Sequence, residues 1–466
     1  MAASDCVWPE SFLPKVVEGC YGYRLCGFVI ALEAWRRGLE VTLCDGRFDR
    51  YIISDGRKSI SFNRSRADLS KRSAVSSAVD KQKTRVLMEA ADVPTPQGKV
   101  FAKGVKENEL VEYANHLGYP VVVKPLKGSL GKGVFSDIRN EHDLVETCRH
   151  VYDDLKKEEL IVEKHFEGED YRVFVAGGMS LAVVKRVPAN VVGDGKHSVR
   201  DLIKRKNKER KENPFLSNGL IKVDREVLSR LRLEGLSLGD VVESGRKVYL
   251  RTKANASAGG DVFDVTDQVP DALKVSAVKA VSSIPGLWQG GVDVLFDEKT
   301  EGFSVIEINS RAQIGVNMYP TDGVGRDVPK GIIDACFPSS KSYRSKFMKR
   351  YSFNPIEVIR AFDSRVVKEV KLSGPIHGDN SRLYSCSLAL DGCGSSVGAI
   401  KKGAEKFNVN GSFVVNFGAG FLYVCAERES MQSFIGFIKN IDGITVRVEK
   451  KWLGVVRQGF VVDRDS

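Results

Sequence analysis

The sequence predicts a protein of several domains that belong to the α/β and α+β classes. Helix-like and strand-like segments alternate from the N-terminus to about residue 338, as expected where helices cover sheets. Residues 354–466 follow the order strand, helix, strand, strand, helix, strand, which is that of a ferredoxin-like βαββαβ domain. With 466 residues, the chain is also longer than the roughly 250–300 residues at which a single core stops growing.

The individual elements follow from hydrophobic periods and turn residues. Four domains are expected, at residues 1–79, 80–164, 165–342 and 354–466, with a basic linker at 343–353. Helices are predicted at residues 24–37, 80–91, 107–117, 141–155, 198–211, 270–283, 395–407 and 430–440. Strands are predicted at residues 40–45, 99–102, 121–124, 160–164, 171–175, 181–186, 247–250, 292–296, 304–308, 383–390, 411–417, 420–426 and 444–448.

The overall composition is that of a soluble globular protein, with 42% hydrophobic and 28% charged residues. The net charge of +11 suits an enzyme that binds polyanionic nucleotides or acidic substrates, and it would also suit a nucleic-acid-binding protein. The dense basic run Lys204–Lys211 contains no aromatic residue, so we interpret it as a solvent-exposed helix face and expect no nucleic-acid partner. No apolar run approaches the ~20 residues of a membrane span, and no membrane partner is expected.

The cysteines and the N-terminus indicate a cytoplasmic protein. Nine cysteines are scattered without a Cys-x-x-Cys pair, which favours reduced thiols over disulfides or a zinc site. The six histidines also lack the spacing of metal ligands. The N-terminus has no basic segment of the kind that begins a signal peptide, so none is expected.

Two neighbouring strands carry a candidate metal site. The segments Gly291–Phe296 and Phe303–Asn309 read as strands joined by a hairpin connection. Alternation along a strand places Glu307 and Asn309 on one face, and Asp293 lies on the strand before. Such oxygen ligands suit Mg²⁺, which is held by one or two carboxylates and completes its shell with phosphates and water. These residues suggest an enzyme that uses ATP.

Two lysines and a glycine-rich loop are candidates for binding the phosphates of that ATP. Lys81 follows Asp80 at the start of a predicted helix, and Lys124 ends an apolar strand beside the loop Lys127–Gly133. A lysine in such a position binds a phosphate as a point charge. Glycines at 128, 131 and 133 allow backbone N–H groups to turn toward anionic oxygens.

A later strand is a candidate for binding the nucleoside. It ends at Glu163 and Lys164 and passes through Phe166 into a loop, where backbone groups are available to adenine. Asp170, further along, can accept hydrogen bonds from ribose hydroxyls.

In this order, these segments resemble the ATP-grasp superfamily, and most of all the ATP-grasp module of cyanophycin synthetases and of bifunctional glutathione synthetases. The resemblance covers about residues 64 to 338 and includes positions outside a generic ATP site. It implies an ATP-grasp fold, with an N-terminal α/β domain followed by a small ATP-lid region at 80–164 and a central catalytic domain at 165–342. The matching stretches are Asp80–Thr84, Val93–Pro96, Val121–Val134, Asp170–Val173, Lys185–Pro188, Gly193–Ile203, Ala254–Gly260, Asp264–Asp267, Gly291–Asp293 and Glu307–Asn309.

The resemblance also implies roles for individual residues. Asp293, Glu307 and Asn309 would hold one or two Mg²⁺ ions, with Mn²⁺ as a substitute. The glycine loop would close over the β- and γ-phosphates of ATP. The ATP-binding residues would be Lys81, Lys124, Lys127, Gly128, Ser129, Gly131, Gly133, Glu163, Lys164, Phe166 and Asp170. Arg186 and Arg311 would be catalytic, and the substrate-binding residues would be Arg172, Asn255, Ser257, Gly259 and Gly260.

By this resemblance, the chain is an ATP-dependent carboxylate–amine ligase that joins amino acids or short peptides. It would act through an acyl phosphate and release ADP and phosphate. Because the further ligase domains of both families are not recognised in the sequence, a stand-alone ligase is expected, with a homodimer or homotetramer as the family-level expectation. The alternatives are a kinase or a carboxylate–thiol ligase on the same scaffold, or a basic nucleic-acid-binding protein without enzymatic activity.

Residues 354–466 resemble a degenerate acylphosphatase-like domain. The phosphate-binding loop of that family ends in an arginine, but Ile400 stands at the corresponding position. Asn416 corresponds to the catalytic asparagine of the family. Phosphatase activity is therefore not expected, and we interpret these residues as a structural or partner-binding module.

Overall fold

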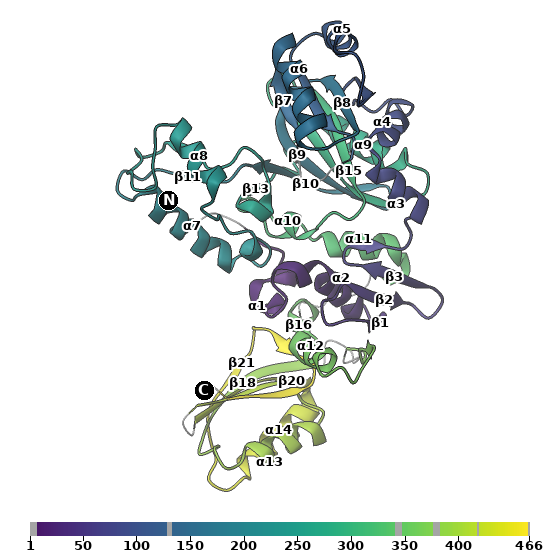
Figure 1. The fold of residues 1–466 in the computed structure, drawn as a ribbon. Coiled ribbons are helices and arrows are strands. Elements are labelled where there is room, and N and C mark those ends of the chain that lie inside the picture. The colour runs from purple at the N-terminus through teal and green to yellow at the C-terminus, as the bar shows by residue number, and fades with distance from the viewer. Residues whose placement is uncertain (1–6, 128–132, 341–346, 376–382, 417–418, 465–466) are drawn as a thin grey trace. The chain divides into compact units, whose positions relative to one another are not determined.

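The computed structural model describes residues 7–127, 133–340, 347–375, 383–416 and 419–464 (Figure 1). The chain forms two compact units. One consists of Met1–Trp8 and Ser65–Gly331, and the other of Pro9–Arg64 and Ile332–Ser466. The four domain boundaries expected from the sequence stay a prediction. No helix in the described part of the chain is long and apolar enough to cross a membrane.

The centre of the first unit is an antiparallel sheet with the strand order β13-β10-β9-β14-β15. Successive side chains of a strand point to opposite faces. On one face, residues such as Val173 and Val292 are fully buried and pack with Leu273 and Ala277 of the covering helix α9 (Figure 1). The other face carries charged side chains. The elements are β9 (Glu169–Ala176), β10 (Met179–Val187), β13 (Asp261–Asp264), α9 (Asp271–Ser282), β14 (Gln289–Phe296) and β15 (Phe303–Asn309).

A β-bulge in β15 determines on which face of the central sheet Glu307 lies. Val294 pairs with Val305 and Asp293 pairs with Glu307, so Ile306 is an extra residue on β15. Val305 is buried on the apolar face, and strict alternation would place Glu307 on that face too. The bulge instead turns Glu307 to the side of Asp293.

A second, smaller sheet has the strand order β5-β8-β6-β7 and is covered by two helices. Its strands and helices confirm the elements predicted between residues 99 and 164. The bounds are β5 (Gly98–Ala102), α5 (Glu107–Leu117), β6 (Val121–Pro125), β7 (Phe135–Ile138), α6 (Glu141–Arg149) with a π-helical continuation (His150–Asp154), and β8 (Glu159–Lys164).

Two helices before this sheet pack on the apolar face of the central sheet. Ala74 and Ala78 of α3 and Met88 of α4 belong to the same buried cluster as α9. Asp80 ends α3 and caps α4, because its side chain accepts a hydrogen bond of 3.0 Å from the backbone N–H of Lys83. The helices are α3 (Arg72–Val79) and α4 (Lys81–Glu89). Near the end of the unit lies α10 (Gly315–Met318), and α11 (Val328–Cys336) begins in this unit and ends in the other.

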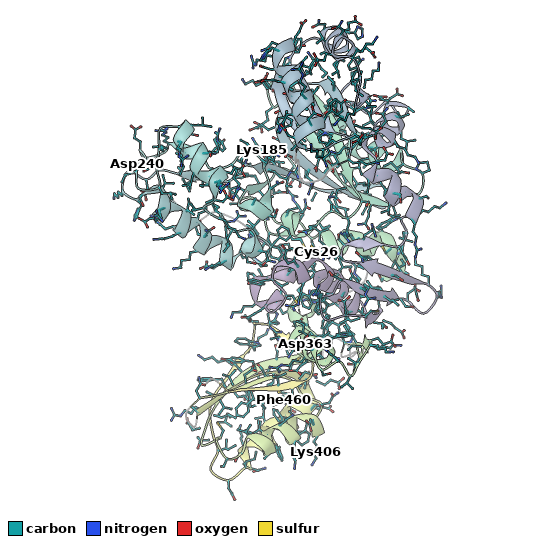
Figure 2. All side chains as sticks on the ribbon, viewed as in Figure 1. Cys26, Lys185, Asp240, Asp363, Lys406 and Phe460 are labelled. Carbon is teal, nitrogen blue, oxygen red and sulfur yellow. The ribbon has the colours of Figure 1, made fainter. Side chains whose placement is uncertain are left out.

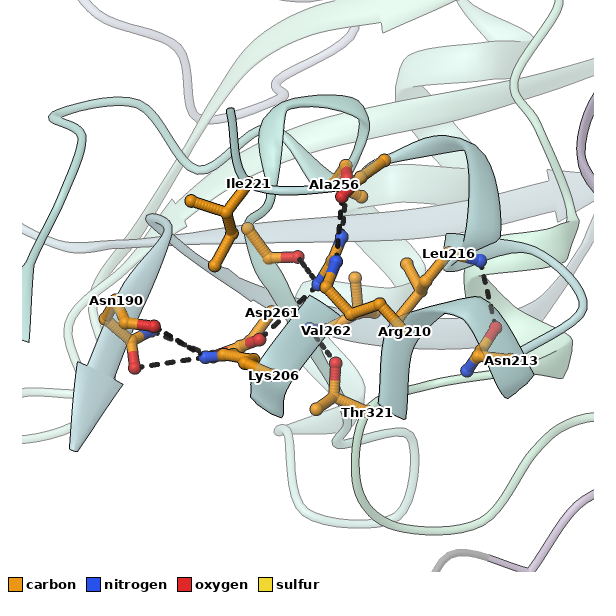
Figure 3. Close-up of polar contacts among 12 residues, drawn as sticks. Asn190, Lys206, Arg210, Asn213, Leu216, Ile221, Ala256, Asp261, Val262 and Thr321 are labelled. Carbon is orange, nitrogen blue, oxygen red and sulfur yellow. Dashed lines mark hydrogen bonds and ion pairs between the residues drawn. The ribbon is translucent and has the colours of Figure 1, made fainter. Parts of the chain in front are cut away.

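Residues between β10 and β13 form a lobe with a core of its own. Its two helices and its short two-stranded sheet lie together in Figure 1, and Figure 2 labels Lys185 on β10 and Asp240 in the loop after α8. The expectation that the run 204–211 is simply a solvent-exposed helix face is wrong in part, because Lys206 is half-buried and Arg210 is buried. Figure 3 shows the polar contacts of these two side chains. The elements are β11 (Asn190–Val192), α7 (Val199–Glu212), α8 (Arg225–Leu233) and β12 (Lys247–Tyr249).

The second unit contains a fully buried helix, α2, and antiparallel strands in the order β17-β1-β2-β3. The expectation of a linker at 343–353 is wrong for the described residues 347–353. Tyr351 and Phe353 are buried, and their rings lie 5.3 and 5.7 Å from that of Trp35. The elements are α1 (Pro14–Val17), α2 (Leu25–Arg36), β1 (Glu40–Leu43), β2 (Arg50–Ser54), β3 (Ser59–Asn63), β16 (Tyr351–Ser352), α12 (Pro355–Asp363) and β17 (Val370–Lys371).

The C-terminal part of this unit forms a sheet with the strand order β21-β18-β20-β19-β23. Its elements confirm the predicted order of strands and helices, while its assignment as a ferredoxin-like, acylphosphatase-like domain stays a prediction. Figure 2 labels Lys406 at the end of α13 and Phe460 on β23. Ile400 lies within α13 and is fully buried. The elements are β18 (Leu383–Asp391), α13 (Val397–Lys406), β19 (Asn410–Asn416), β20 (Ala419–Glu427), α14 (Arg428–Lys439), β21 (Thr445–Lys451), β22 (Val456–Arg457) and β23 (Phe460–Arg464).

Candidate active site

The polar face of the central sheet brings together residues that lie far apart in the sequence. Asp293 on β14 is flanked directly by Glu307 on β15 and by Arg172 on β9. Asp170 on β9 is opposite Arg186 on β10. Since cross-strand neighbours share a face, these five side chains form one charged row.

Two arginines hold the carboxylates of this row. Arg172 donates to both oxygens of Asp293, over 2.6 and 2.8 Å, and Arg186 Nη2 lies 3.3 Å from Asp293 Oδ2. Arg186 also donates through Nε and Nη2 to Asp170. In the described part of the chain, Nη1 of Arg186 has no hydrogen-bond partner, so this expected catalytic arginine keeps donors for a substrate while it orients two acids.

The two aspartates differ in their pKa values. Burial raises the pKa of Asp293, but the nearby Arg172 and Arg186 outweigh it, and the pKa is lowered overall. For Asp170, burial outweighs Arg186 and raises the pKa to about 6. Both groups are therefore charged at neutral pH.

The oxygen donors on this face fit a divalent cation. Asp293 and Glu307 are directly opposite on adjacent strands, and Asn309 follows on the same face. Asn309 is exposed, and its Oδ1 accepts a hydrogen bond of 3.0 Å from the N–H of Arg311. Each carboxylate oxygen has two lone pairs, so Asp293 can accept from Arg172 and still bind a cation. This donor set suits Mg²⁺.

A pocket beside the row is lined from both sheets of the unit. Its charged lining consists of Lys81 at the start of α4, Lys124 on β6, Glu163 on β8 and Glu307 on β15, together with Arg85. Lys124 Nζ lies 2.6 Å from Glu163 Oε1, and both side chains are less than 10% exposed. The remaining lining residues are Ala78, Thr84, Met88, Thr95, Pro96, Ile161, Ile306 and Ile308.

The positive charge of Lys81 in this pocket is not balanced by an ion-pair partner among the described residues. Burial lowers the pKa of its ammonium, the nearby Glu307 raises it, and Lys124 lowers it further. The ammonium of Lys81 forms no ion pair or hydrogen bond with any described residue. Because a partly buried cation without a partner is costly, an anionic ligand would be stabilised here.

The segment expected to hold adenine is fixed by its neighbours. Gly98 pairs with Glu163, and a Cβ atom at Gly98 would lie 2.8 Å from the Glu163 Cβ, so only glycine fits there without a shift. The Lys164 ammonium donates to the carbonyl of Gly118 over 2.7 Å. The side chain of Lys164 is therefore engaged within the protein, whereas Phe166 lies half-buried beyond the strand end.

The expected phosphate loop is only partly within the described residues. Lys127 and Gly133 are described, whereas Gly128, Ser129 and Gly131 lie outside that part of the chain. Gly133 has a φ of +74°, and a Cβ atom there would lie 3.0 Å from Pro125. Both facts favour glycine at this end of the loop.

The expected substrate loop joins the site through β13. Asn255 precedes a short 3-10 helix, Ala256–Ala258, and Gly259 follows with a φ of +97°. The loop enters β13, where Val262 is opposite Arg186. Ser257 is exposed, so its hydroxyl is accessible.

Sequence reasoning missed Arg66, which interacts electrostatically with the expected catalytic Arg311. Gln289, fully buried on β14, bonds the backbone on both sides of Arg66, at the carbonyl of Ser65 (2.8 Å) and the N–H of Ala67 (3.0 Å). The pKa of Arg66 is lowered by burial and by the charge of Arg311. A two-residue strand has no detectable period, so the sequence contained no signal for this position.

Comparisons with known proteins agree with this geometry. Residues 80–172 match the family described as carbamoyl-phosphate synthase L chain, ATP binding domain. A cyanophycin synthetase of Crocosphaera subtropica is 33% identical over 279 residues, covering 58% of this chain and 32% of that protein. The glutathione biosynthesis bifunctional protein GshAB of Desulfotalea psychrophila is 29% identical over 335 residues, covering 69% of this chain and 42% of the relative.

A solved structure also shares the fold. The bifunctional glutathione synthetase of Pasteurella multocida matches with a TM-score of 0.54 and 24% identity, over 68% of this chain and 45% of that chain. Two sheets that line one pocket with lysines and carboxylates are what an ATP-grasp fold is expected to provide. The chain has an ATP-grasp fold, and its sequence is similar to those of cyanophycin synthetases and bifunctional glutathione synthetases. It spans about a third of the length of the cyanophycin synthetases that it matches.

Proposed function

We propose that this chain is an ATP-dependent ligase that joins a carboxylate to an amine, with amino acids or short peptides as substrates. One observation supports this most strongly. Lys81, Lys124, Glu163 and Glu307, from four different elements and both sheets, line one pocket beside the charged row of the central sheet. The names of the relatives, a cyanophycin synthetase and a bifunctional protein of glutathione biosynthesis, favour the same class of reaction.

The reaction would proceed in two steps. First, an oxygen of the substrate carboxylate attacks the γ-phosphorus of ATP, the bond to the bridging oxygen breaks, and ADP leaves with an acyl phosphate formed. Then the neutral amine attacks the acyl carbon, the carbon–oxygen bond breaks, phosphate leaves, and the nitrogen loses a proton to solvent. Phosphoryl transfer of this kind depends mainly on positioning and on neutralisation of charge.

Different residues of the chain would bind ATP, the metal ion and the carboxylate substrate. Lys81 and Lys124 bind the phosphates of ATP, and Asp170 binds the ribose. Asp293, Glu307 and Asn309 hold Mg²⁺, which when bound neutralises phosphate charge. The carboxylate would lie near Arg311, and the Nη1 donors of Arg186 would stabilise the oxyanion of the second step.

Arg66 would add a second guanidinium for the carboxylate substrate. It interacts electrostatically with Arg311, and the backbone on either side of it is fixed by Gln289. A second positive charge in the neighbourhood of Arg311 would favour an acidic substrate at this position.

The proposal is tested by incubating the protein with Mg²⁺-ATP and a panel of amino acids and short peptides. We expect ADP and phosphate in equal amounts together with an amide, and a hydroxamate when hydroxylamine replaces the amine. A phosphorylated product without free phosphate would instead identify a kinase, and a thioester would identify a carboxylate–thiol ligase. ADP formation that no carboxylate stimulates would refute the proposal.

A further inference from the structure

The C-terminal sheet has an edge strand that lies in a cleft. β23 is the last strand in the sheet order and, among the described strands, pairs only with β19. The cleft beside it has a volume of about 520 Å³, and its walls come from α12 and α13 (Figure 1) and from the residues after β17. Clefts of about 300–1,000 Å³ are typical of ligand-binding sites. Every residue that lines this cleft belongs to the second unit.

Backbone groups of β23 point away from its partner strand without partners of their own. The N–H of Gly411 on β19 donates to the carbonyl of Gly459, directly before β23, over 2.7 Å. Backbone groups of alternate residues in a strand point to opposite sides, so bonding to β19 continues at Val461. The N–H and C=O groups of Phe460 and Val462 therefore point to the free edge, and no described residue forms a hydrogen bond with them. They are available to a ligand in the cleft.

The two edges of this sheet differ in charge. β21, at the opposite edge, carries Arg447, Glu449, Lys450 and Lys451, and charged side chains of this kind discourage the pairing of a further strand. β23 instead begins with three uncharged residues, 460–462, which are half-buried and line the cleft. The edge at β23 is therefore suited to accept an added strand, whereas the edge at β21 is protected against one.

The side chains around the cleft indicate what such a strand would carry. Val358 on α12 and Leu372 after β17 provide apolar lining. Two of the charged lining residues, Glu357 and Arg360, bond to each other over 2.8 Å. The third, Lys401 on α13, forms no ion pair with any described residue. One unbalanced positive charge beside apolar surface is complementary to a peptide with apolar side chains and a carboxylate.

The start of β23 is fixed to the other walls of the cleft. The side-chain amide of Gln458 donates to Ser373 Oγ over 2.8 Å, and its carbonyl oxygen accepts from the hydroxyl of Tyr351 over 3.1 Å. The N–H of Gly459 donates to Asn410 Oδ1 over 2.8 Å. Because these contacts hold the edge strand in place without a ligand, little ordering of the protein would oppose binding.

We propose that this cleft binds an extended peptide with apolar side chains and a free carboxylate, which adds a strand to the C-terminal sheet. The peptide backbone bonds to Phe460 (labelled in Figure 2) and Val462, and the carboxylate binds Lys401. Because the strand lies between walls from two helices, a single extended segment fits better than the edge of a second folded copy. The inference goes beyond the proposed ligase function and does not depend on it, since this binding requires no ATP.

Fluorescence anisotropy tests the backbone half of the inference. The probe is a five-residue peptide of alternating valine and threonine with a free C-terminus and a neutral fluorophore at its N-terminus. Wild-type protein should bind it saturably. Val462→Pro removes one outward N–H, which an edge strand tolerates, and should weaken binding about tenfold, the effect of one lost hydrogen bond. Val462→Ala is the matched control, because it shortens the side chain and keeps the N–H, and it should bind like wild type.

The same assay with the C-terminal amide of the peptide tests the role of Lys401. Wild-type protein should bind the free acid about fivefold more tightly than the amide, as expected for an ion pair near the surface. Lys401→Ala should abolish this preference. Lys402→Ala should keep it, because Lys402 is exposed on the same helix and does not line the cleft. An equal preference in wild type and Lys401→Ala would overturn the assignment of the carboxylate.

Hydrogen exchange in wild-type protein locates the peptide without any substitution, so it decides the question even if Val462→Pro fails to fold. We expect the peptide to slow amide exchange in residues 460–462 and to leave exchange in β21 unchanged. Slower exchange at β21 instead, or no saturable binding at millimolar peptide, would overturn the inference. A dimer that Val462→Pro dissociates would identify a second copy of the chain as the occupant and would also overturn it.

Discussion

Glu307 and Asp293 are neighbours on adjacent strands, but their removal should have different consequences. Asp293 holds both donors of Arg172 and also contacts Arg186. The side chain of Glu307 has no ion pair or hydrogen bond with any described residue, although it lines the pocket with Lys81. Glu307→Gln should therefore abolish ligase activity and leave the fold stable, whereas Asp293→Asn should abolish activity and also destabilise the protein.

The expected loss of stability in each variant follows from the environment of the carboxylate that is removed. Removal of one partner from a buried ion pair costs about 3–5 kcal/mol. Arg172 and Asp293 are 17% and 20% exposed, so solvent reduces this cost to about 2–3 kcal/mol for Asp293→Asn. For a unit of this size that loss corresponds to a drop in Tm of about 3–5 °C. Glu307→Gln should stay within about 0.5 kcal/mol of wild type.

Two measurements on each variant separate these effects. Thermal or urea unfolding gives the stability, and ADP release with the best carboxylate and amine of the panel gives the activity. Loss of a metal ligand should reduce turnover more than about 100-fold, since even outer-shell partners of a metal are typically worth 10–100-fold. Glu307→Gln with full activity would refute the metal assignment. Equal destabilisation by both substitutions would refute the inference that Asp293 stabilises the fold and Glu307 does not.

Three further predictions concern other parts of the chain. Lys124→Met should weaken ATP binding at least tenfold in a calorimetric titration. It should also lower the Tm, because Glu163 is left buried without its partner. Unchanged affinity for ATP would contradict the role of Lys124 in binding phosphate. Arg66→Gln should raise the KM for the carboxylate about tenfold and leave ATP affinity unaltered, so an effect on ATP affinity alone would count against it. Ile400→Arg should unfold the C-terminal sheet, as followed by limited proteolysis, because it buries a charge in the core. Ile400→Val should lower the free energy of unfolding by only about 0.5–1.5 kcal/mol. A folded, protease-resistant arginine variant would show that this core is not closed.

Strong periods and turn residues made much of the fold predictable. The strands that carry Asp293 and Glu307 are bounded by turns and rich in β-branched residues, and they appear as expected. Asp80 marked the start of α4 because a residue of its type caps helices. The same local signals predicted the order of elements in residues 383–451.

The features that sequence reasoning missed depend on distant contacts. One such feature is the contact between Arg172 and Asp293. The two residues are 121 positions apart in the sequence and are adjacent only because β9 pairs with β14. The inner face of α7 was read as solvent-exposed because charge alone does not reveal that Arg210 donates to three backbone carbonyls. Residues 347–353 were read as a linker, yet Tyr351 is buried by packing against Trp35 from the other end of the chain.

A crystal structure with a non-hydrolysable ATP analogue and Mg²⁺ would test the central proposal most directly. We expect the triphosphate within hydrogen-bonding distance of Lys81 and Lys124, the adenine against residues 163–166, and the cation bound by Asp293 and Glu307. A pocket that stays empty at saturating nucleotide, or a nucleotide bound elsewhere on the chain, would contradict it.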